Sequence, residues 1–221
     1  TLDLSSWTET VYSLAGFPSI GLTNGLPHTC WEEKSEIYHC FNDGTGWTSK
    51  QLISDTTIPA HHPSLEVWRD PWGMDRTVHI VWQADDGKIY HRAGNITWSG
   101  TQDEVVFDPI KEVSQGYGEP GEQAVITAGQ ILWRYIGPNS QIYYARYDGT
   151  NWVDHEDLTG NIPEDYFPSV AIELAPFSWQ TSQLHYVYTE GVDDAYEVKK
   201  GTKDVIVLSK TPRHDVAIKD V

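Results

Sequence analysis

Short runs of apolar and aromatic residues, separated by a few polar residues, recur along the whole chain. These runs are rich in β-branched and aromatic residues, which favour strands, and they are bounded by Gly, Pro, Asn and Asp, which favour turns. No run approaches the roughly 18 apolar residues that a membrane-spanning helix needs. The pattern therefore predicts an all-β protein made of short antiparallel strands.

Four copies of one unit can be aligned along the chain. Each copy opens with a short run that contains a Pro-Ser step in all but the third copy, at residues 17–20, 62–65, 122–125 and 167–170. An apolar strand that ends in an aromatic residue follows at 28–31, 79–82, 132–135 and 185–188. A further strand follows at 37–39, 89–91, 142–144 and 195–197. The internal repeat predicts one supersecondary unit per copy.

A turn and a tryptophan close three of the units. The turns fall at 43–44, 94–95 and 148–149, where a glycine accepts the positive φ of a tight turn. Trp47, Trp98 and Trp152 follow, and we expect them to begin the last strand of each unit. Their spacing of about 50 residues is that of a four-stranded propeller blade. So regular a repeat favours a role as wedges between blades rather than as ligand contacts.

The ends of the chain resemble partial units. Residues 6–8 resemble 46–48, residues 214–218 resemble 168–172, and 203–209 forms a further strand. The resulting strand count fits neither four nor five complete blades, so either the ends pair within a shared blade or the chain is cut from a longer propeller. We favour closure, because an open propeller leaves unpaired strand edges. The prediction is a single β-propeller domain over residues 1–221, with four to five four-stranded antiparallel blades closed by the N- and C-terminal strands and repeat units at about 17–56, 62–113, 122–160 and 167–209.

Two of the turns resemble a known family. Residues 42–47 and 147–152 resemble degenerate Asp-boxes, the turn motif of sialidase-like β-propellers, and similar aromatic repeats occur in propeller lectins. The chain departs from a full Asp-box, because the preceding serine and the usual glycine spacing are missing. The resemblance therefore implies a fold more than an activity.

Charge and cysteine content suggest where the protein works. The formal net charge is −17, which disfavours nucleic acids and anionic lipid surfaces as partners and gives no reason to expect membrane insertion.

Cys30 and Cys40 lie on neighbouring strands, and a turn centred near Ser35 would place them opposite each other as a disulfide. Asn95 begins an Asn-Ile-Thr glycosylation triplet on a predicted turn. Together these features predict a secreted or cell-surface protein.

Three histidines share one strand position, namely His28, His79 and His185, and the sequence alignment places Leu132 at the fourth copy. A position that accepts leucine is a packing position, so we interpret these histidines as structural. No Cys, His and Asp cluster has the spacing of a metal site. We predict neither a metal nor a cofactor.

Departures from the repeat are the best candidates for a ligand site. One insertion carries Trp72 with Asp70 and Arg76, and an insertion at the matching place in the fourth unit carries Trp179. An exposed indole can stack on a sugar ring, although these side chains could equally cover the core. The stretch 101–121 adds Tyr117 among several acids, and a solvated acidic loop is its alternative interpretation. His62 precedes a first strand and could face the central opening.

The predicted function is carbohydrate binding of the lectin type, without catalysis, with a glycan or glycoprotein as the partner. A sialidase needs three arginines around its substrate, and no such trio can be assigned among the six arginines present. A glycosidase needs two facing carboxylates, which the sequence does not single out. A secreted glycoside hydrolase or polysaccharide lyase stays an alternative, and a protein-binding scaffold is the second. The sequence assigns no catalytic residue and no oligomeric state.

Overall fold

The computed structural model describes residues 15–23, 25–69, 76–98, 103–127, 129–137, 141–158, 165–173, 183–190, 194–199 and 205–209. From residue 165 onward only the backbone of the strands is described. All regular structure in the described residues is antiparallel β-sheet, which confirms the all-β part of the predicted fold class. No helix that could cross a membrane occurs among these residues.

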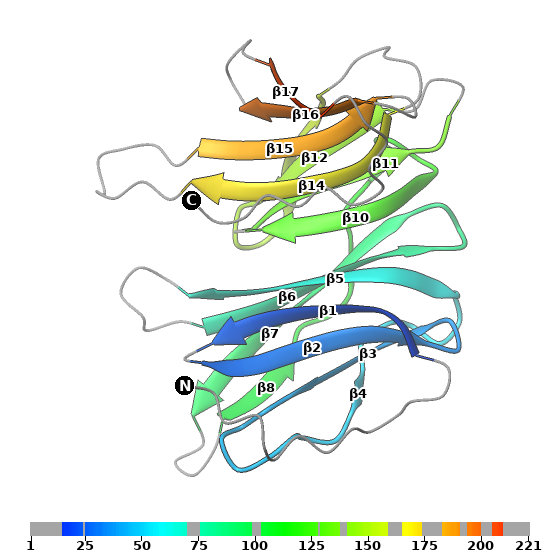
Figure 1. The fold of residues 1–221 in the computed structure, drawn as a ribbon. Helices are drawn as coiled ribbons and strands as arrows, with labels where there is room; N and C mark the ends of the chain where they lie inside the picture. Colours follow the sequence, from blue (N-terminus) through cyan, green and yellow to red (C-terminus); the bar gives the residue numbers. More distant parts are fainter. Residues whose placement is uncertain are drawn as a thin grey trace.

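The strands form four sheets, each from one continuous stretch of chain (Figure 1). The first contains β1 (Ala15–Thr23), β2 (Leu26–Glu33), β3 (Glu36–Phe41) and β4 (Gln51–Leu52). The second contains β5 (Ala60–Arg69), β6 (Arg76–Ala84), β7 (Ile89–Trp98), β8 (Asp103–Phe107) and β9 (Lys111–Glu112). The third contains β10 (Gly121–Thr127), β11 (Gln130–Tyr135), β12 (Gln141–Tyr147) and β13 (Trp152–Asp157). The fourth contains β14 (Asp165–Glu173), β15 (Gln183–Glu190), β16 (Asp194–Lys199) and β17 (Val205–Ser209).

The first strands of successive sheets lie side by side, β1 on β5, β5 on β10 and β10 on β14 (Figure 1). Such stacking around the first strand of each sheet is consistent with a β-propeller. Within the described residues, β14 makes no comparably extensive contact with β1, so a closed ring is not seen. The predicted terminal strands at 6–8 and 214–218 lie outside the described residues.

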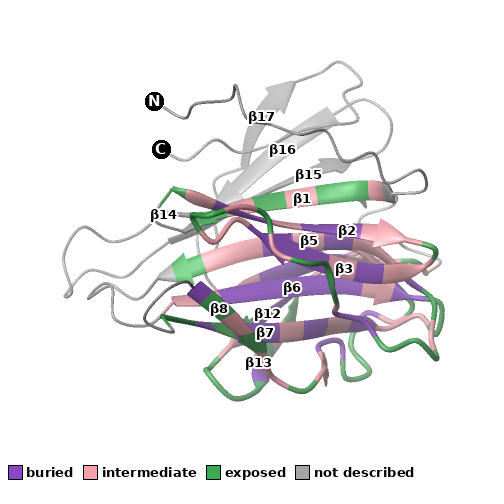
Figure 2. Ribbon diagram, turned by 90° about the horizontal axis from the view of Figure 1, so that it is seen from below, coloured by how far each residue is buried: buried purple, intermediate pink, exposed green. Residues whose placement is uncertain are grey.

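Two separate cores lie between neighbouring sheets. The first joins the first and second sheets through side chains such as Ile37, Leu65 and Trp82. The second joins the second and third sheets through side chains such as Val81 and Trp133. Strand β6 contributes to both cores, and Figure 2 shows it buried along most of its length. A strand covered on both faces has no need of polar alternation, which explains its continuous apolar run.

The tryptophans that are buried at an equivalent position of successive sheets are not the ones that the sequence repeat predicted. Trp152 is buried as expected, but Trp98 ends β7 with 63% of its surface exposed and Trp47 is 43% exposed. The true repeat is on the second strand of the first three sheets, where a buried tryptophan faces a tyrosine of the third strand. These pairs are Trp31 with Tyr38, Trp82 with Tyr90, and Trp133 with Tyr143. They provide a common register for comparing the sheets.

A β-bulge interrupts the first strand of every sheet at the position of the Pro-Ser step, including the third sheet, whose sequence lacks that step. Phe17, His62 and Gln123 occupy the same place in three of these bulges, each with a φ of 51°. A bulge increases the local twist of a strand and turns its next side chain. The sequence repeat at this step thus encodes a backbone feature.

The same hydrogen bond joins the first strands of neighbouring sheets at two interfaces. Ser19 Oγ accepts from Leu65 N at 2.9 Å, and Ser64 Oγ accepts from Ile126 N at 3.4 Å. In each case a serine beside the bulge binds the backbone of the following sheet. The successive sheets are therefore set in equivalent positions relative to one another.

The predicted disulfide is wrong. Cys30 and Cys40 are both free and buried. The hairpin turn consists of the two residues Lys34 and Ser35, both with positive φ, so Cys30 lies opposite His39 rather than Cys40. Because successive strand residues point to opposite faces, the one-residue offset places the two thiols on opposite sides of the sheet.

The predicted position of Asn95 is also wrong. It lies inside β7, paired with Thr77 on one side and Val106 on the other, because the strand continues to Trp98. Its side chain and that of Thr97 are exposed. Glycosylation at Asn95 stays a prediction.

Candidate interface pocket

Three of the predicted ligand-binding residues, Asp70, Trp72 and Trp179, lie outside the described residues. Arg76 is described, at the start of β6, and its two terminal nitrogens each donate to Asp103 at 2.7 Å. Side-chain exposure is only 13% for Arg76 and 6% for Asp103. The hydrogen bond to Asp103 raises the pKa of the Arg76 guanidinium. This bidentate pair ties β6 to β8, so the guanidinium already has a partner within the protein.

His62 lies in the bulge of β5. Its ring meets Phe17 of the preceding sheet edge-on, with centroids 4.0 Å apart, and its Nδ1 is buried without a hydrogen-bond partner. Its backbone N donates to Glu32 Oε2 at 3.3 Å. The neighbouring His61 lies between Glu32 Oε1 at 2.9 Å and Asp85 Oδ1 at 3.1 Å. These contacts connect the first two sheets.

Tyr117 is 51% exposed and stacks on the ring of His155, with centroids 4.7 Å apart and planes 15° apart. His155 comes from β13 of the third sheet, and its Nε2 donates to Val113 O at 2.7 Å. The described part of the stretch 101–121, residues 103–121, is therefore no free acidic loop: it contributes β8 and β9 to the second sheet, and Tyr117 packs against the third sheet. Tyr117 is exposed close in sequence to a pocket at this interface.

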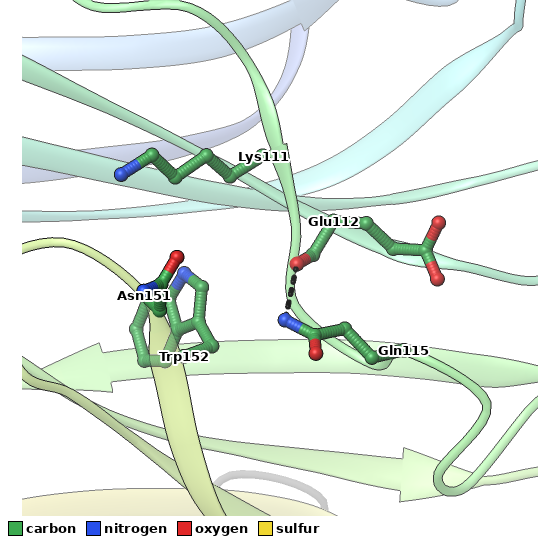
Figure 3. Close-up of a pocket in the computed structure, with 5 residues that line it drawn as sticks. All are labelled: Lys111, Glu112, Gln115, Asn151 and Trp152. Carbon is green, nitrogen blue, oxygen red and sulfur yellow. Dashed lines mark hydrogen bonds between the residues drawn. The ribbon is translucent and has the colours of Figure 1, made fainter.

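The pocket lies between β9 of the second sheet and β13 of the third, with a volume of about 490 Å³. It is lined by Lys111, Glu112, Gln115, Asn151 and Trp152 (Figure 3). Of these, the sequence analysis included Glu112 among the acids of the stretch 101–121 and interpreted Trp152 as a packing residue. The stretch 101–121 and the turn at 148–149 were both noted in the sequence. Their proximity in the fold depends on the pairing of β9 with β7, which no local sequence pattern indicates.

Two short loops hold the lining residues in place. Glu119 Oε1 accepts from Ser114 Oγ at 2.7 Å and from Gly116 N at 2.8 Å, which fixes the loop that carries Gln115. Asp148 Oδ1 accepts from Asn151 N at 2.7 Å and from Thr150 N at 2.8 Å. These backbone donors, Asn151 N foremost, lower the pKa of the Asp148 carboxyl. The sequence prediction of tight Asp-Gly turns is confirmed here, with Gly149 at a φ of 98°.

Hydrogen-bond donors dominate the pocket. Lys111 Nζ donates to Tyr147 Oη at 3.2 Å and to Thr150 O. Gln115 Nε2 donates to Glu112 O at 3.4 Å, as the dashed line in Figure 3 marks. Trp152 is 3% exposed, and its Nε1 has no hydrogen-bond partner. A buried indole N–H without an acceptor is costly, so this edge of the pocket favours a ligand that brings an oxygen acceptor.

The only carboxylate lining this pocket belongs to Glu112, and it is already paired with Lys88 Nζ at 2.7 Å. Hydrolysis of a glycosidic bond requires two carboxyl groups on opposite sides of the bond. The pocket lining does not provide that pair. In the described part of the chain, no group of three or more His, Cys, Asp and Glu could hold a metal ion.

Polar pairs are buried beside the same interfaces. His28 Nδ1 lies 3.2 Å from His39 Nε2, and His79 Nδ1 lies 2.9 Å from His91 Nε2. Burial lowers the pKa of His28 and of His79 to about 4 and that of His39 to about 3. Burial also lowers the pKa of His91 well below its usual value. All four rings are therefore neutral at neutral pH.

The structural register corrects the alignment of the third copy. The position three residues before the strand tryptophan is His28, His79 and Gln130, not Leu132. Tyr144 Oη donates to Gln130 Oε1 at 2.9 Å, in the place of the histidine pairs. The position is thus polar in every described sheet, and the leucine argument for simple packing was wrong. The sequence alignment was displaced by two residues, because it matched Tyr135 rather than Trp133 to the strand tryptophans of the other copies.

Comparison with known proteins supports the fold. No protein-family model matches the sequence, and no curated protein matches it at a significant level. Among solved structures, a variant of AofleA from Arthrobotrys oligospora with three arginines replaced by alanine aligns with a TM-score of 0.56 at 13% identity. AofleA is a fungal lectin with a β-propeller fold. The alignment covers 86% of this chain and 55% of that chain, so this chain spans about half the length of its neighbour. These comparisons give no support to a sialidase relationship.

Proposed function

We propose that this protein is a carbohydrate-binding, lectin-like β-propeller without catalysis, and that the interface pocket binds the sugar. The observation that carries the proposal is the unpartnered, buried Trp152 Nε1 in a pocket lined by ammonium and amide donors. Sugar hydroxyl and ring oxygens are suitable acceptors for such groups. The exposed ring of Tyr117 nearby offers an apolar face for stacking.

The fold of the neighbour AofleA, a fungal lectin, is a second support. Fold similarity at 13% identity is no argument for a shared ligand, so the proposal depends on the pocket. The lack of a second carboxylate in the lining favours binding over glycoside hydrolysis. The sugar is presented on a glycan or glycoprotein, as expected for a secreted or cell-surface protein.

We also propose that the sheets form a single propeller domain whose ring is closed by the chain ends. Ile20 and Leu22 of β1 are 61% and 60% exposed in the described structure. Leu65, which occupies the position of Ile20 in the second sheet, is only 6% exposed because the first sheet covers it. A cover for β1 would bury Ile20 in the same way. Hydrogen exchange would then protect the β1 amides as strongly as those of β5, whereas fast exchange along β1 alone would contradict closure.

The binding proposal is tested by a glycan array followed by titration calorimetry with the best glycan. Asn151→Ala and Gln115→Ala should each weaken binding about fivefold to tenfold, because each removes one hydrogen bond to the sugar. Asn95→Ala removes an exposed amide from β7 and serves as the matched control with unchanged affinity. An array without any hit contradicts the proposal. Release of reducing ends from the bound glycan would favour the hydrolase alternative instead.

A further inference from the structure

The residue that fills the first interface has no equivalent in the second. Arg92 of β7 lies opposite Ile80, two residues before Trp82. Ala145 of β12 lies opposite Ile131, two residues before Trp133. The register therefore identifies Ala145 as the counterpart of Arg92.

Arg92 reaches across to the first sheet. Its Nη1 donates to Ile53 O at 3.1 Å and to Leu52 O at 3.4 Å, and its Nε donates to Asp108 O at 2.8 Å. The guanidinium carbon also lies 5.5 Å from the centroid of the Phe107 ring. The guanidinium thus occupies the space between β4 and Phe107.

This space corresponds to the pocket of the second interface. Ile53 N donates to Ile37 O and Val113 N donates to Ile89 O, so Leu52 and Ile53 match Glu112 and Val113. Phe107 meets His39 edge-on at 5.4 Å, just as Trp152 meets His91 at 5.0 Å, so these two aromatic residues also correspond. Arg92 therefore lies between the counterparts of Glu112 and Trp152, two residues that line the pocket.

At the second interface other side chains bind the same two carbonyls. Gln115 Nε2 donates to Glu112 O at 3.4 Å, and His155 Nε2 donates to Val113 O at 2.7 Å. Both approach from positions that leave the volume beside Trp152 free. Ala145 is buried in the second core rather than in the pocket lining, and it has no atoms beyond Cβ that could extend into this volume.

We propose that the first interface holds a closed counterpart of the pocket and that Arg92 is the plug that closes it. At the two interfaces whose side chains are described, the residue at this one strand position then decides whether a site is open. Arginine closes an interface and alanine opens it. The nature of the ligand in an opened site rests on the proposed function, but the existence of the cavity does not.

Crystal structures of Arg92→Ala and Arg92→Met, each soaked in glycerol, test the plug. We expect a cavity beside Phe107 in the alanine variant, with a glycerol hydroxyl donating to Leu52 O or Ile53 O. The methionine variant keeps an unbranched apolar stem and guards against loss of folding in the alanine variant; it should show a smaller opening at the same place. Arg146→Ala removes an exposed arginine from β12 and should leave the first interface closed. Collapse of β4 onto Phe107 without a cavity in both Arg92 variants would overturn the proposal.

Calorimetry with the glycan selected on the array adds a functional readout. Arg92→Ala should raise the number of sites by one, and Ala145→Arg should weaken binding at the original pocket at least tenfold. A cavity in Arg92→Ala without a second site for that glycan would overturn the equivalence of the two sites. If the wild-type protein binds no glycan, the proposed function fails while the crystal structures still decide whether Arg92 is a plug.

Discussion

The interface between the first and second sheets and the interface between the second and third share their backbone connections. Both interfaces contain the hydrogen bond from a serine to the backbone of the following sheet. At both interfaces, the residue after the repeated tryptophan also accepts a hydrogen bond from the bulge of the following sheet. Glu32 Oε2 accepts from His62 N at 3.3 Å, and Gln83 Oε1 accepts from Gln123 N at 2.8 Å.

The two interfaces differ in the side chains that fill them. The first is closed by the Arg92 guanidinium, whereas the second has Ala145 at the same position and contains the pocket. Bonds directed at the backbone fix the spacing of the sheets, so the side chains between them are free to differ. Under our proposal, the second interface holds a site because this copy of the repeat lacks the filling residue.

The largest expected effect concerns the ion pairs of the two neighbouring sheets. Asp103→Ala should destabilise the protein by about 3 kcal/mol, because it leaves the buried Arg76 without a partner. Asp154→Ala should cost less than about 0.5 kcal/mol, because Arg146 and Asp154 are 46% and 57% exposed. Urea denaturation of both variants measures the difference. Equal losses of stability in the two variants would mean that the Arg76 guanidinium finds another partner when Asp103 is removed. Arg76 would then be available to a ligand, as the sequence suggested.

The next effect follows from the buried histidine pairs. Their folded pKa values lie below 6.5, so in acid the unfolded chain takes up protons that the folded protein cannot. Stability is therefore fully present above about pH 6.5 and falls as the pH drops toward 4, by about 2 kcal/mol for each such histidine at pH 5.

The third sheet supplies the control for this acid effect. Its Gln130 and Tyr144 form the equivalent buried pair without a group that titrates in this range. The double variant His79→Gln with His91→Tyr should therefore lose less melting temperature between pH 7 and pH 5 than the wild type. An unchanged pH dependence would show that other groups cause the acid sensitivity.

The smallest effect distinguishes the two serine bonds. Ser19→Ala should cost about 1 kcal/mol, because it leaves the Leu65 backbone N–H without its acceptor at 2.9 Å. Ser64→Ala should cost less, because its bond to Ile126 N is longer, at 3.4 Å. Thermal unfolding of the two single variants measures this order. A larger loss for Ser64→Ala would mean that the interfaces are not equivalent in their connections.

The sequence predicted the fold class and the Asp-Gly turns well, because both depend on local residue preferences. The turn of Asp43, for example, forms as expected, with its Oδ1 accepting from Thr45 N and Gly46 N. The predicted strand register was wrong where it depended on the placement of a single residue. Which residue lies opposite Cys30 depends on the length of the hairpin turn, which consists of Lys34 and Ser35. The pattern of apolar residues does not show how many residues a turn contains.

The site was predicted poorly for a different reason. Its residues come from β9, a two-residue strand, and from the far turn of another sheet. Two residues are too few to show a periodic pattern of apolar positions, so no local sequence pattern indicates that Lys111 lies near Trp152. Tyr117 was identified as a departure from the repeat, and it does lie at this interface. The principle that departures from the repeat form sites was useful, but it did not identify the absent arginine at Ala145.

The central claim is that a sugar binds beside Trp152, and the indole N–H resonance of Trp152 tests it most directly. Nitrogen-labelled protein shows one indole signal for each of its ten tryptophans, and Trp152→Phe assigns the signal of interest. Titration with the array-selected glycan should shift this resonance the most, with saturation at the calorimetric affinity, because its free N–H gains an acceptor. A glycan that binds with the same affinity while the Trp152 signal stays fixed would contradict the account.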